Sequence, residues 1–461
     1  MSTAPAYRIE ADSLGEVRVP AQAYWGVHTF RAIENFPISG TPISRHPSLV
    51  EALATVKQAA ASANYELGLL PPATASAIVS ACERIRAGEL REEFCVDVVQ
   101  GGAGTSTNMN ANEVIANAAL EHLGLGRGRY DRLHPINDVN RSQSTNDVYP
   151  TAVKLAIVAA FRRLLPELES LAAAFEERGR AHAGVRKIGR TQLQDAVPMT
   201  LGQELTAFGV AIREDTVRIR EVIPLLLECS LGATAIGTGI TADPAYPEAA
   251  LRHLRRLTDL PIQPASDLFE ATWDTGSFLH ASGILRRTAI KLSKISNDLR
   301  LLSSGPQAGF GEITLPSRQA GSSIMPGKVN PVIPEVVNQV AFAIVGADVS
   351  IAFASEAGQL QLNAFEPIIA HSLLQSIGWL TNGVRVLRDL CVSGIEANRE
   401  LLAERAATSI GAITSLVPEI GYDTAARAAE HALAEGVPIG EAVAHVSGLT
   451  RREAERLLAL S

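Results

Sequence analysis

The chain has 461 residues, of which 46% are hydrophobic, so it can bury a large core and form roughly two to four domains. Its formal net charge of -8 argues against a general affinity for nucleic acid or for an anionic membrane surface. An anionic substrate must therefore meet a local cluster of hydrogen-bond donors rather than a basic surface.

The cysteines and the apolar segments indicate in which cellular compartment the protein lies. Four cysteines are scattered without C-x-x-C spacing, which suits a reducing environment and provides neither a disulfide framework nor a zinc site. Residues 1–24 include Arg8, Glu10 and Asp12 and lack the apolar core of a signal peptide. The most apolar run, Ala341–Ala354, is shorter than a membrane span. We therefore predict a cytoplasmic protein that binds neither membrane nor nucleic acid.

The first half of the chain is expected to be helical. Before Asn140 the sequence predicts short helices joined by glycine-rich connections. A long helix is expected from Tyr149-Pro150 past Phe175, because apolar residues recur at helical spacing, and Pro166 should kink it. Another helix is expected over Leu205–Leu227. These lengths are typical of a helical bundle.

The helix that begins near Phe278 has the most regular pattern. Its apolar positions follow alternating three- and four-residue steps, which is typical of a bundle seam. The seam residues are Phe278, Ala281, Leu285, Leu292, Ile295, Leu299 and Leu302, with Thr288 as the one polar member. Residues 303–306, Ser-Ser-Gly-Pro, are expected to end the helix.

Two more helices are expected after Pro331 and Pro367, and the first is apolar on nearly all faces. Such a helix must pack against more surface than one chain provides, so we predict a helical homo-oligomer. After about Asn398 a small helical unit rich in Ala, Glu and Arg follows. The changes in pattern predict an N-terminal mixed, mostly helical domain over residues 1–140, a central bundle over 141–398 and a C-terminal helical domain over 399–461.

Three polar segments interrupt the predicted helices, and each has an ordinary structural explanation. Residues 100–110 place hydroxyls and amides directly after glycines, where backbone can approach a ligand, but a helix N-cap gives the same pattern. Residues 142–147 precede a long helix, whose N-terminus favours anions, although capping explains one or two of these polar residues. Residues 189–195 form a polar turn, for which a plain loop is an equal explanation.

A fourth segment, Gly321–Pro331, collects two serines, a lysine and an asparagine between glycines and then runs into an apolar helix. It is not a nucleotide-binding P-loop, because five residues separate Gly321 from Gly327 and Val329 follows the lysine. A solvated turn between two helices is the ordinary alternative.

The chemistry of this loop points to proton removal beside a carboxylate. The resulting carbanion is stable only where preorganised donors hold its charge, and backbone N–H groups together with Lys328 can supply them. A serine without a histidine partner serves as the base only if surrounding donors lower its pKa, which a glycine-flanked loop can arrange on closing. Ser322 is our candidate for that base.

The four segments together are similar, in order and separation, to the characteristic blocks of the aspartase/fumarase superfamily. The similarity extends from about Tyr24 to the C-terminal helical unit. Within the superfamily the aspartases are most similar, since fumarases usually have histidine at the position of Gln192. The segments that resemble aspartases are residues 24–29, 100–105, 189–198 and 356–363.

The resemblance implies a mainly α, three-domain fold whose central long-helix bundle assembles into a tetrameric helical core. It implies sites that draw on three of the four chains. The implied reaction is the reversible anti-elimination of ammonia from L-aspartate to give fumarate, through a carbanion (aci-carboxylate) delocalised into the β-carboxylate. The resemblance implies no cofactor.

It also implies a role for individual residues. Ser322 resembles the base that takes the Cβ proton. The residues that resemble the holders of the β-carboxylate are Thr105, Ser144, Thr145 and Ser323. Those that resemble the α-carboxylate clamp are Thr191, Lys328 and Asn330. Asn146 and Gln192 would contact the amino group, and a neutral amide can accept from an ammonium without competing for its proton.

Two departures from the family pattern mean that functions other than aspartase activity stay open. Residues 133–140 carry Ile136 and Asn137 where the family often has Asn then Asp, which puts an accessory carboxylate site near His134 in question. Residues 421–423 resemble the fumarase version of the C-terminal unit. The alternatives are an ammonia-lyase for another amino acid, a class II fumarase, or a protein that kept the scaffold and lost activity.

One further motif and the histidines imply no prosthetic group. Gly237–Ala242 fits G-x-G-x-x-A, but no strand pattern precedes it, so no nicotinamide cofactor is expected. The histidines do not pair at metal-ligand spacing, and we expect no required metal.

Overall fold

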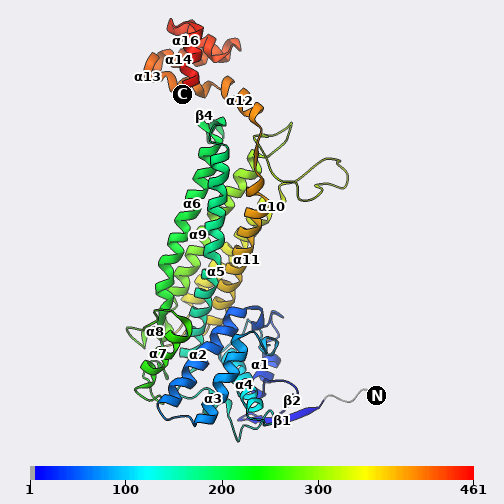
Figure 1. Ribbon diagram of the computed structural model, residues 1–461, viewed down its shortest axis with the longest axis vertical. Helices are drawn as coiled ribbons and strands as arrows, with labels where there is room; N and C mark the ends of the chain where they lie inside the picture. The colour runs from blue at the N-terminus through cyan, green and yellow to red at the C-terminus, as the bar shows by residue number, and fades with distance from the viewer. Residues whose placement is uncertain (1–5, 461) are drawn as a thin grey trace. The chain divides into compact units, whose positions relative to one another are not determined.

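The computed structural model describes residues 6–460, which are mostly helical (Figure 1). The predicted mainly α fold is therefore confirmed. The chain divides into two compact units that are described separately here. Unit 1 comprises residues 1–165, 217–287 and 343–380, and unit 2 comprises residues 166–216, 288–342 and 381–461.

Five helices of more than 20 residues contribute to both units. They are α5 (Thr145–Ala181), α6 (Leu201–Val222), α9 (Gly276–Leu302), α10 (Val332–Glu356) and α11 (Glu366–Leu390). The predicted seam of α9 is confirmed, because its seven apolar residues are at most 5% exposed and Thr288 is 1% exposed. The helix ends at Leu302, directly before the predicted stop residues.

Two of these helices differ at their ends from the sequence prediction. α5 begins at Thr145 rather than Tyr149, because Ser144 and Asp147 cap it. The Ser144 hydroxyl accepts from the Asn146 N–H at 3.3 Å, and the Asp147 carboxylate accepts from the Ser144 N–H at 3.0 Å. α6 ends at Val222, and a short 3-10 helix, Ile223–Leu227, completes the predicted segment.

Unit 1 opens with an antiparallel hairpin of β1 (Tyr7–Asp12) and β2 (Gly15–Pro20), which the sequence did not predict. Two helices are longer than the short ones predicted before Asn140, and they are buried over most of their lengths: α2 (Pro47–Glu66) and α4 (Thr105–His122). The other helices of the unit are α1 (Val27–Asn35), α3 (Pro72–Arg86), α7 (Tyr246–Thr258) and α8 (Glu270–Trp273). A two-residue parallel pair, β5 (Glu228–Cys229) and β6 (Gln263–Pro264), lies beside α7 in sequence.

Unit 2 contains a second hairpin, β3 (Arg186–Thr191) and β4 (Gln194–Thr200), and the short pair β7 (Ile313–Thr314) and β8 (Glu396–Ala397). Its C-terminal helices are α12 (Arg399–Thr408), α13 (Val417–Ile420), α14 (Tyr422–Glu435), α15 (Ile439–Ser447) and α16 (Arg451–Leu460). The last four share a small core with the 3-10 helix Ile410–Leu416, built from Ile413, Leu416, Ala428 and Val443. The expected helical unit after Asn398 is therefore present.

α10 carries large exposed apolar side chains, among them Phe342 at 65% and Phe353 at 70% exposure. It is long and apolar enough, by length and composition alone, to cross a membrane. The run that we judged too short for a span is thus part of a 25-residue helix, and length does not decide the question. In its middle, Asp348 accepts from Ser282 at 2.7 Å and pairs with Arg286 of α9 at 2.6 Å. This polar pairing is what a helix within a bundle needs.

Candidate active site

The polar segment at residues 100–110 forms a tight turn and the start of α4. Residues 102–104 all have positive φ, between 54° and 92°. A Cβ on Gly104 would lie 2.5 Å from the ring of Tyr149, so only glycine fits there. Thr105 is the first residue of α4, and its exposed hydroxyl donates to the Gly102 carbonyl at 2.7 Å. The turn therefore presents Thr105 at a helix N-terminus.

The turn at residues 144–147 starts α5 in the same unit. Ser144, Thr145 and Asn146 are half-buried. The Thr145 hydroxyl accepts from the buried Asn108 amide of α4 at 3.0 Å. The starts of α4 and α5 are thus joined by a hydrogen bond, and anions are favoured at both helix N-termini.

A buried amide network lies behind this pair of helix starts. The Asn140 Oδ1 atom accepts from Lys57 Nζ at 2.8 Å and from the Nδ2 atoms of Asn108 and Asn112, both at 3.1 Å. Lys57 is fully buried, and burial lowers its pKa to about 7. Sequence analysis missed Lys57 and the contacts of Asn108, because their partners are distant in the chain.

Asp147 ties the turn to a second loop. It is fully buried and accepts from the backbone N–H of Ser144 at 3.0 Å and of Gly232 at 2.9 Å. Burial raises the pKa of Asp147 to about 7, although these two N–H groups and the Lys57 charge lower it in part. The capping pattern Ser-x-x-Asp was a signal for its position, but not for its contact with Gly232.

The third polar segment is the tip of the β3–β4 hairpin in unit 2. Gln192 and Leu193 form its two-residue loop with φ of 54° and 63°. Both central residues of such a turn need positive φ, and Asn-Gly is the usual choice. A Gln-Leu pair there is strained, and strain of this kind clusters at functional sites. The turn leaves Thr191 and Gln192 exposed.

Buried charges anchor this hairpin. Glu312 pairs with Arg190 at 2.5 Å and with Lys187 at 2.8 Å, and Lys187 pairs also with Glu204 at 2.6 Å. Burial raises the pKa of Glu312, but the two cations outweigh it and the net shift is downward. At the other strand, Asp195 accepts from the Ser409 hydroxyl at 2.5 Å. These anchors hold the hairpin up to the Arg190–Asp195 pair, directly before its tip.

The loop Gly321–Pro331 also lies in unit 2 and is closed by its backbone. The Gly321 N–H donates to the Lys328 carbonyl at 2.8 Å, and the Asn330 amide donates to the Gly321 carbonyl at 3.1 Å. A Cβ on Gly321 would lie 2.5 Å from the Lys328 oxygen, so the loop needs glycine there. The Ser323 and Lys328 side chains are exposed.

Ser322, the predicted base, has two N–H donors beside its hydroxyl. Its half-buried hydroxyl oxygen accepts from the backbone N–H of Ile324 at 3.2 Å and of Met325 at 3.1 Å. Hydrogen bonds from N–H donors favour the charged form of an oxygen, so both stabilise a Ser322 alkoxide. The role of Ser322 as the base stays a prediction.

The ten predicted site residues fall into two groups. Thr105, Ser144, Thr145 and Asn146 belong to unit 1, whereas Thr191, Gln192, Ser322, Ser323, Lys328 and Asn330 belong to unit 2. Neither unit by itself contains the complete set.

Neither a metal cluster nor a free His134 ring is found in the part of the chain that the structure describes. Among residues 6–460, no three His, Cys, Asp or Glu side chains are grouped as a metal site requires. His134 caps the π-helix Pro135–Val139, where its Nδ1 atom accepts from the N–H groups of Ile136 at 3.0 Å and Asn137 at 3.2 Å. The Nδ1 atom of His134 is therefore engaged in local structure.

Two protein-family models match the sequence. The model described as Lyase covers residues 15–346, which is most of the chain. The chain belongs to this lyase family. The model described as the fumarase C C-terminus covers residues 413–461, in agreement with the resemblance seen at residues 421–423.

Individual relatives agree with the family. The aspartate ammonia-lyase of Pseudomonas aeruginosa is 56% identical over 444 residues, which are 96% of this chain and 94% of that protein. The crystal structure of the fumarate lyase:delta crystallin from Brucella melitensis bound to cobalt matches with a TM-score of 0.96. The two sequences are 55% identical, and 98% of both chains is covered. The class II fumarase of Schistosoma mansoni has a TM-score of 0.94 and 35% identity over 98% of both chains. The predicted similarity to the aspartase/fumarase superfamily, and within it to aspartases, is confirmed.

Proposed function

We propose that this protein is a carbon–nitrogen lyase that converts L-aspartate reversibly into fumarate and ammonia. The 56% identity to an aspartate ammonia-lyase over nearly the whole chain supports the activity. The observation that carries the mechanism is the Ser322 hydroxyl, which accepts two backbone N–H bonds in a loop that otherwise offers Lys328 and Asn330.

In this mechanism the Ser322 alkoxide takes the proton from Cβ of aspartate. The electron pair of the broken C–H bond passes into the β-carboxylate, giving the aci-carboxylate, and then forms the double bond as the C–N bond breaks. The amine leaves with the bonding pair. Ser322 stands in for the usual histidine or carboxylate base because its two N–H donors lower the cost of its charge.

The β-carboxylate gains charge in the intermediate, and we assign it to the starts of α4 and α5. Thr105 and Thr145 are the first residues of these helices, and Ser144 precedes the second. Helix N-termini and hydroxyl donors favour a developing negative charge. Ser323 adds a hydroxyl from the loop.

The opposite end of the substrate needs one cation and several amides. We assign the α-carboxylate to Lys328, Asn330 and Thr191, and the amino group to Asn146 and Gln192. The strained turn at Gln192 and the exposed Lys328 side chain support these roles. Glutamine is neutral, so Gln192 does not repel the positively charged amino group of the substrate.

We infer that the active protein is a cytoplasmic homotetramer with sites shared between subunits and with the three domains 1–140, 141–398 and 399–461. The exposed apolar side chains of α9 and α10 give a surface for assembly: Leu279, Ile290, Val336, Phe342, Val349 and Phe353.

A class II fumarase is the second candidate, favoured by the match of residues 413–461 to the fumarase C C-terminus. Purified protein should be tested with a panel of L-amino acids and with L-malate, following the ultraviolet absorbance of the unsaturated acid and the release of ammonia. We expect fumarate and ammonia in equal amounts from L-aspartate. Faster turnover of malate, or of another amino acid, would replace this proposal with one of the alternatives.

A further inference from the structure

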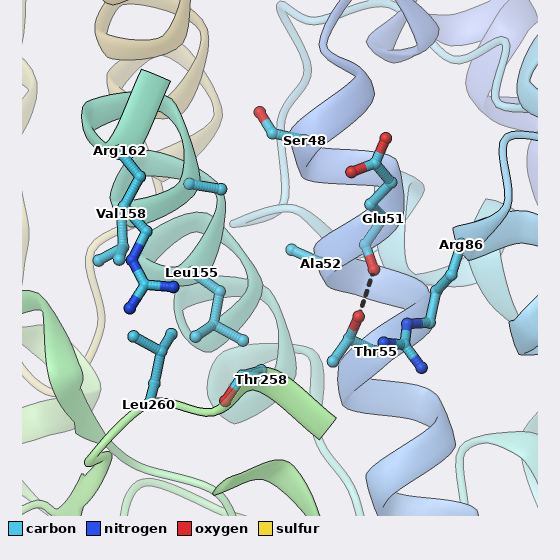
Figure 2. A pocket seen from close by; sticks show the side chains of 11 residues that line it. Ser48, Glu51, Ala52, Thr55, Arg86, Leu155, Val158, Arg162, Thr258 and Leu260 are labelled. Atoms are coloured by element: carbon cyan, nitrogen blue, oxygen red, sulfur yellow. Dashed lines mark hydrogen bonds between the residues drawn. The ribbon is translucent and has the colours of Figure 1, made fainter. Parts of the chain in front are cut away.

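A cavity of about 350 Å³ opens in unit 1 among α2, α5, the end of α3 and the segment after α7 (Figure 2). This volume lies in the range of about 300–1,000 Å³ that is usual for small-molecule sites. Leu155 on its wall lies ten residues beyond Thr145 along α5, which is roughly 15 Å at the helical rise. The cavity is therefore separate from the residues that we assign to catalysis in this unit.

The cavity has a polar wall and an apolar wall. The polar wall comes from α2 and α3 and consists of Ser48, Glu51, Thr55 and Arg86. The apolar wall comes from α5 and the segment after α7 and contains Leu155, Val158, Ala159 and Leu260, with Arg162 and Thr258 at the same side of the cavity. Such a division suits a ligand with a charged head and a hydrocarbon body.

Arg86 is oriented by the protein itself. One of its terminal nitrogens donates to the Gln58 side chain at 2.7 Å and the other to the Leu257 carbonyl at 3.4 Å. A guanidinium held in this way keeps further N–H groups for a ligand and loses little entropy on binding. Planar N–H pairs of this kind recognise carboxylates.

Glu51 and Arg162 provide opposite charges at the cavity. The nearest cation to the Glu51 carboxylate is Arg91, at 3.9 Å, and the Glu51 side chain is 44% exposed. This leaves carboxylate lone pairs for an ammonium donor. Arg162 is an exposed residue of α5, and Figure 2 shows its guanidinium above Leu155 and Leu260.

We propose that this cavity binds a small α-amino acid with an apolar side chain. Its carboxylate would bind Arg86, its ammonium would bind Glu51, and its side chain would extend toward Leu155 and Leu260 on the opposite side of the cavity.

Binding should be measured by calorimetry on the intact protein with L-leucine and with two probes that each lack one charge, 4-methylpentanoate and 3-methylbutylamine. We expect saturable binding of L-leucine and much weaker binding of either probe. Absence of L-leucine binding up to about 10 mM would overturn the proposal. So would tighter binding of fumarate than of L-leucine at this site.

Matched variants locate the binding. Arg86→Met should weaken L-leucine binding by at least about tenfold, whereas Arg163→Met, which changes an exposed arginine outside the cavity, should not. Glu51→Gln should weaken L-leucine but not 4-methylpentanoate. If Lys328→Ala abolishes L-leucine binding and Arg86→Met does not, the amino acid occupies the catalytic residues instead and the cavity proposal is wrong.

Discussion

The turn at residues 144–147 and the loop Gly321–Pro331 carry similar hydroxyl and amide side chains, yet the protein holds them in different ways. The turn is held by hydrogen bonds to two buried side chains, the Asp147 carboxylate and the Asn108 amide. The loop is closed by its own backbone and leaves Ile324 83% exposed. We infer that the carboxylate-binding part is built before substrate arrives, and that the part with the base is completed by closure.

The exposed apolar residues of the loop give closure a driving force. Ile324, Met325 and Val329 are all at least 48% exposed. Full burial of one such side chain is worth about 1.5–3 kcal/mol. A loop that covers these residues on closing would offset part of the entropy that it loses.

The largest effect is expected from Ser322→Ala. Because the loop has no second group with two N–H donors on a hydroxyl, turnover of aspartate should fall by about 100-fold to 10,000-fold or more. The melting temperature should not change, since the loop is exposed. Ser317→Ala, at an exposed serine nearby, is the control and should keep normal turnover. Near wild-type turnover of Ser322→Ala would refute the proposed mechanism.

Removal of the buried Asp147 carboxylate, which holds the turn at residues 144–147, should lower the stability of the fold. Asp147→Ala leaves the N–H groups of Ser144 and Gly232 without their acceptor. We expect a loss of roughly 2–5 kcal/mol in the free energy of unfolding. Asp147→Asn keeps an acceptor oxygen and should lose less. Urea denaturation of the three proteins tests this order, and equal stability of all three would contradict it.

Lys328→Ala should separate binding from folding. If Lys328 clamps the α-carboxylate, the loss of one charge-assisted contact should cost roughly 1.5–3 kcal/mol in kcat/KM. The cost should be the same for aspartate and for any other substrate that carries this carboxylate. Steady-state kinetics with at least two substrates will decide, and a loss confined to one of them would remove Lys328 from the shared clamp.

Glu366 gives the buried region a pH dependence. This carboxyl, in the first turn of α11, is 6% exposed, and burial raises its pKa to about 8. Because the folded state binds this proton more tightly than the unfolded state, the proton stabilises the fold fully below pH 4.5, the ordinary pKa of the group. That stabilisation is lost as the pH rises toward 8. Glu366→Gln should therefore reduce the fall in stability between pH 5 and pH 9, by on the order of 1–3 kcal/mol. Melting curves across this range should show the smaller loss of stability in Glu366→Gln, with Glu400→Gln, at an exposed site, as the control. The same pH dependence of stability in Glu366→Gln and wild type would contradict the prediction.

The sequence was most informative where side chains repeat. The α9 seam followed from helical periodicity, because every third or fourth residue faces a core. The β3–β4 hairpin was missed because its turn is Gln192-Leu193, which lacks the Asn-Gly signal of a two-residue turn. The start of α5 was misplaced although Ser144 and Asp147 gave a capping signal.

The candidate site shows the same contrast. The four polar segments were recognisable because each concentrates hydroxyls, amides and glycines in a short stretch of chain. The groups that hold them were not, because Lys57 lies 83 residues from Asn140, and Asp147 lies 85 residues from Gly232. Contacts over such separations depend on the tertiary fold, which local patterns do not specify.

The difference between the two regions can be measured directly by amide hydrogen exchange with and without saturating substrate. We predict that the amides of residues 322–330 exchange rapidly in the free protein and at least about tenfold more slowly with substrate bound. The amides of residues 144–151 should exchange slowly in both states. Equal protection of the 322–330 loop in the two states would contradict closure over the substrate, and with it the division between a prebuilt carboxylate site and a closing loop that carries the base.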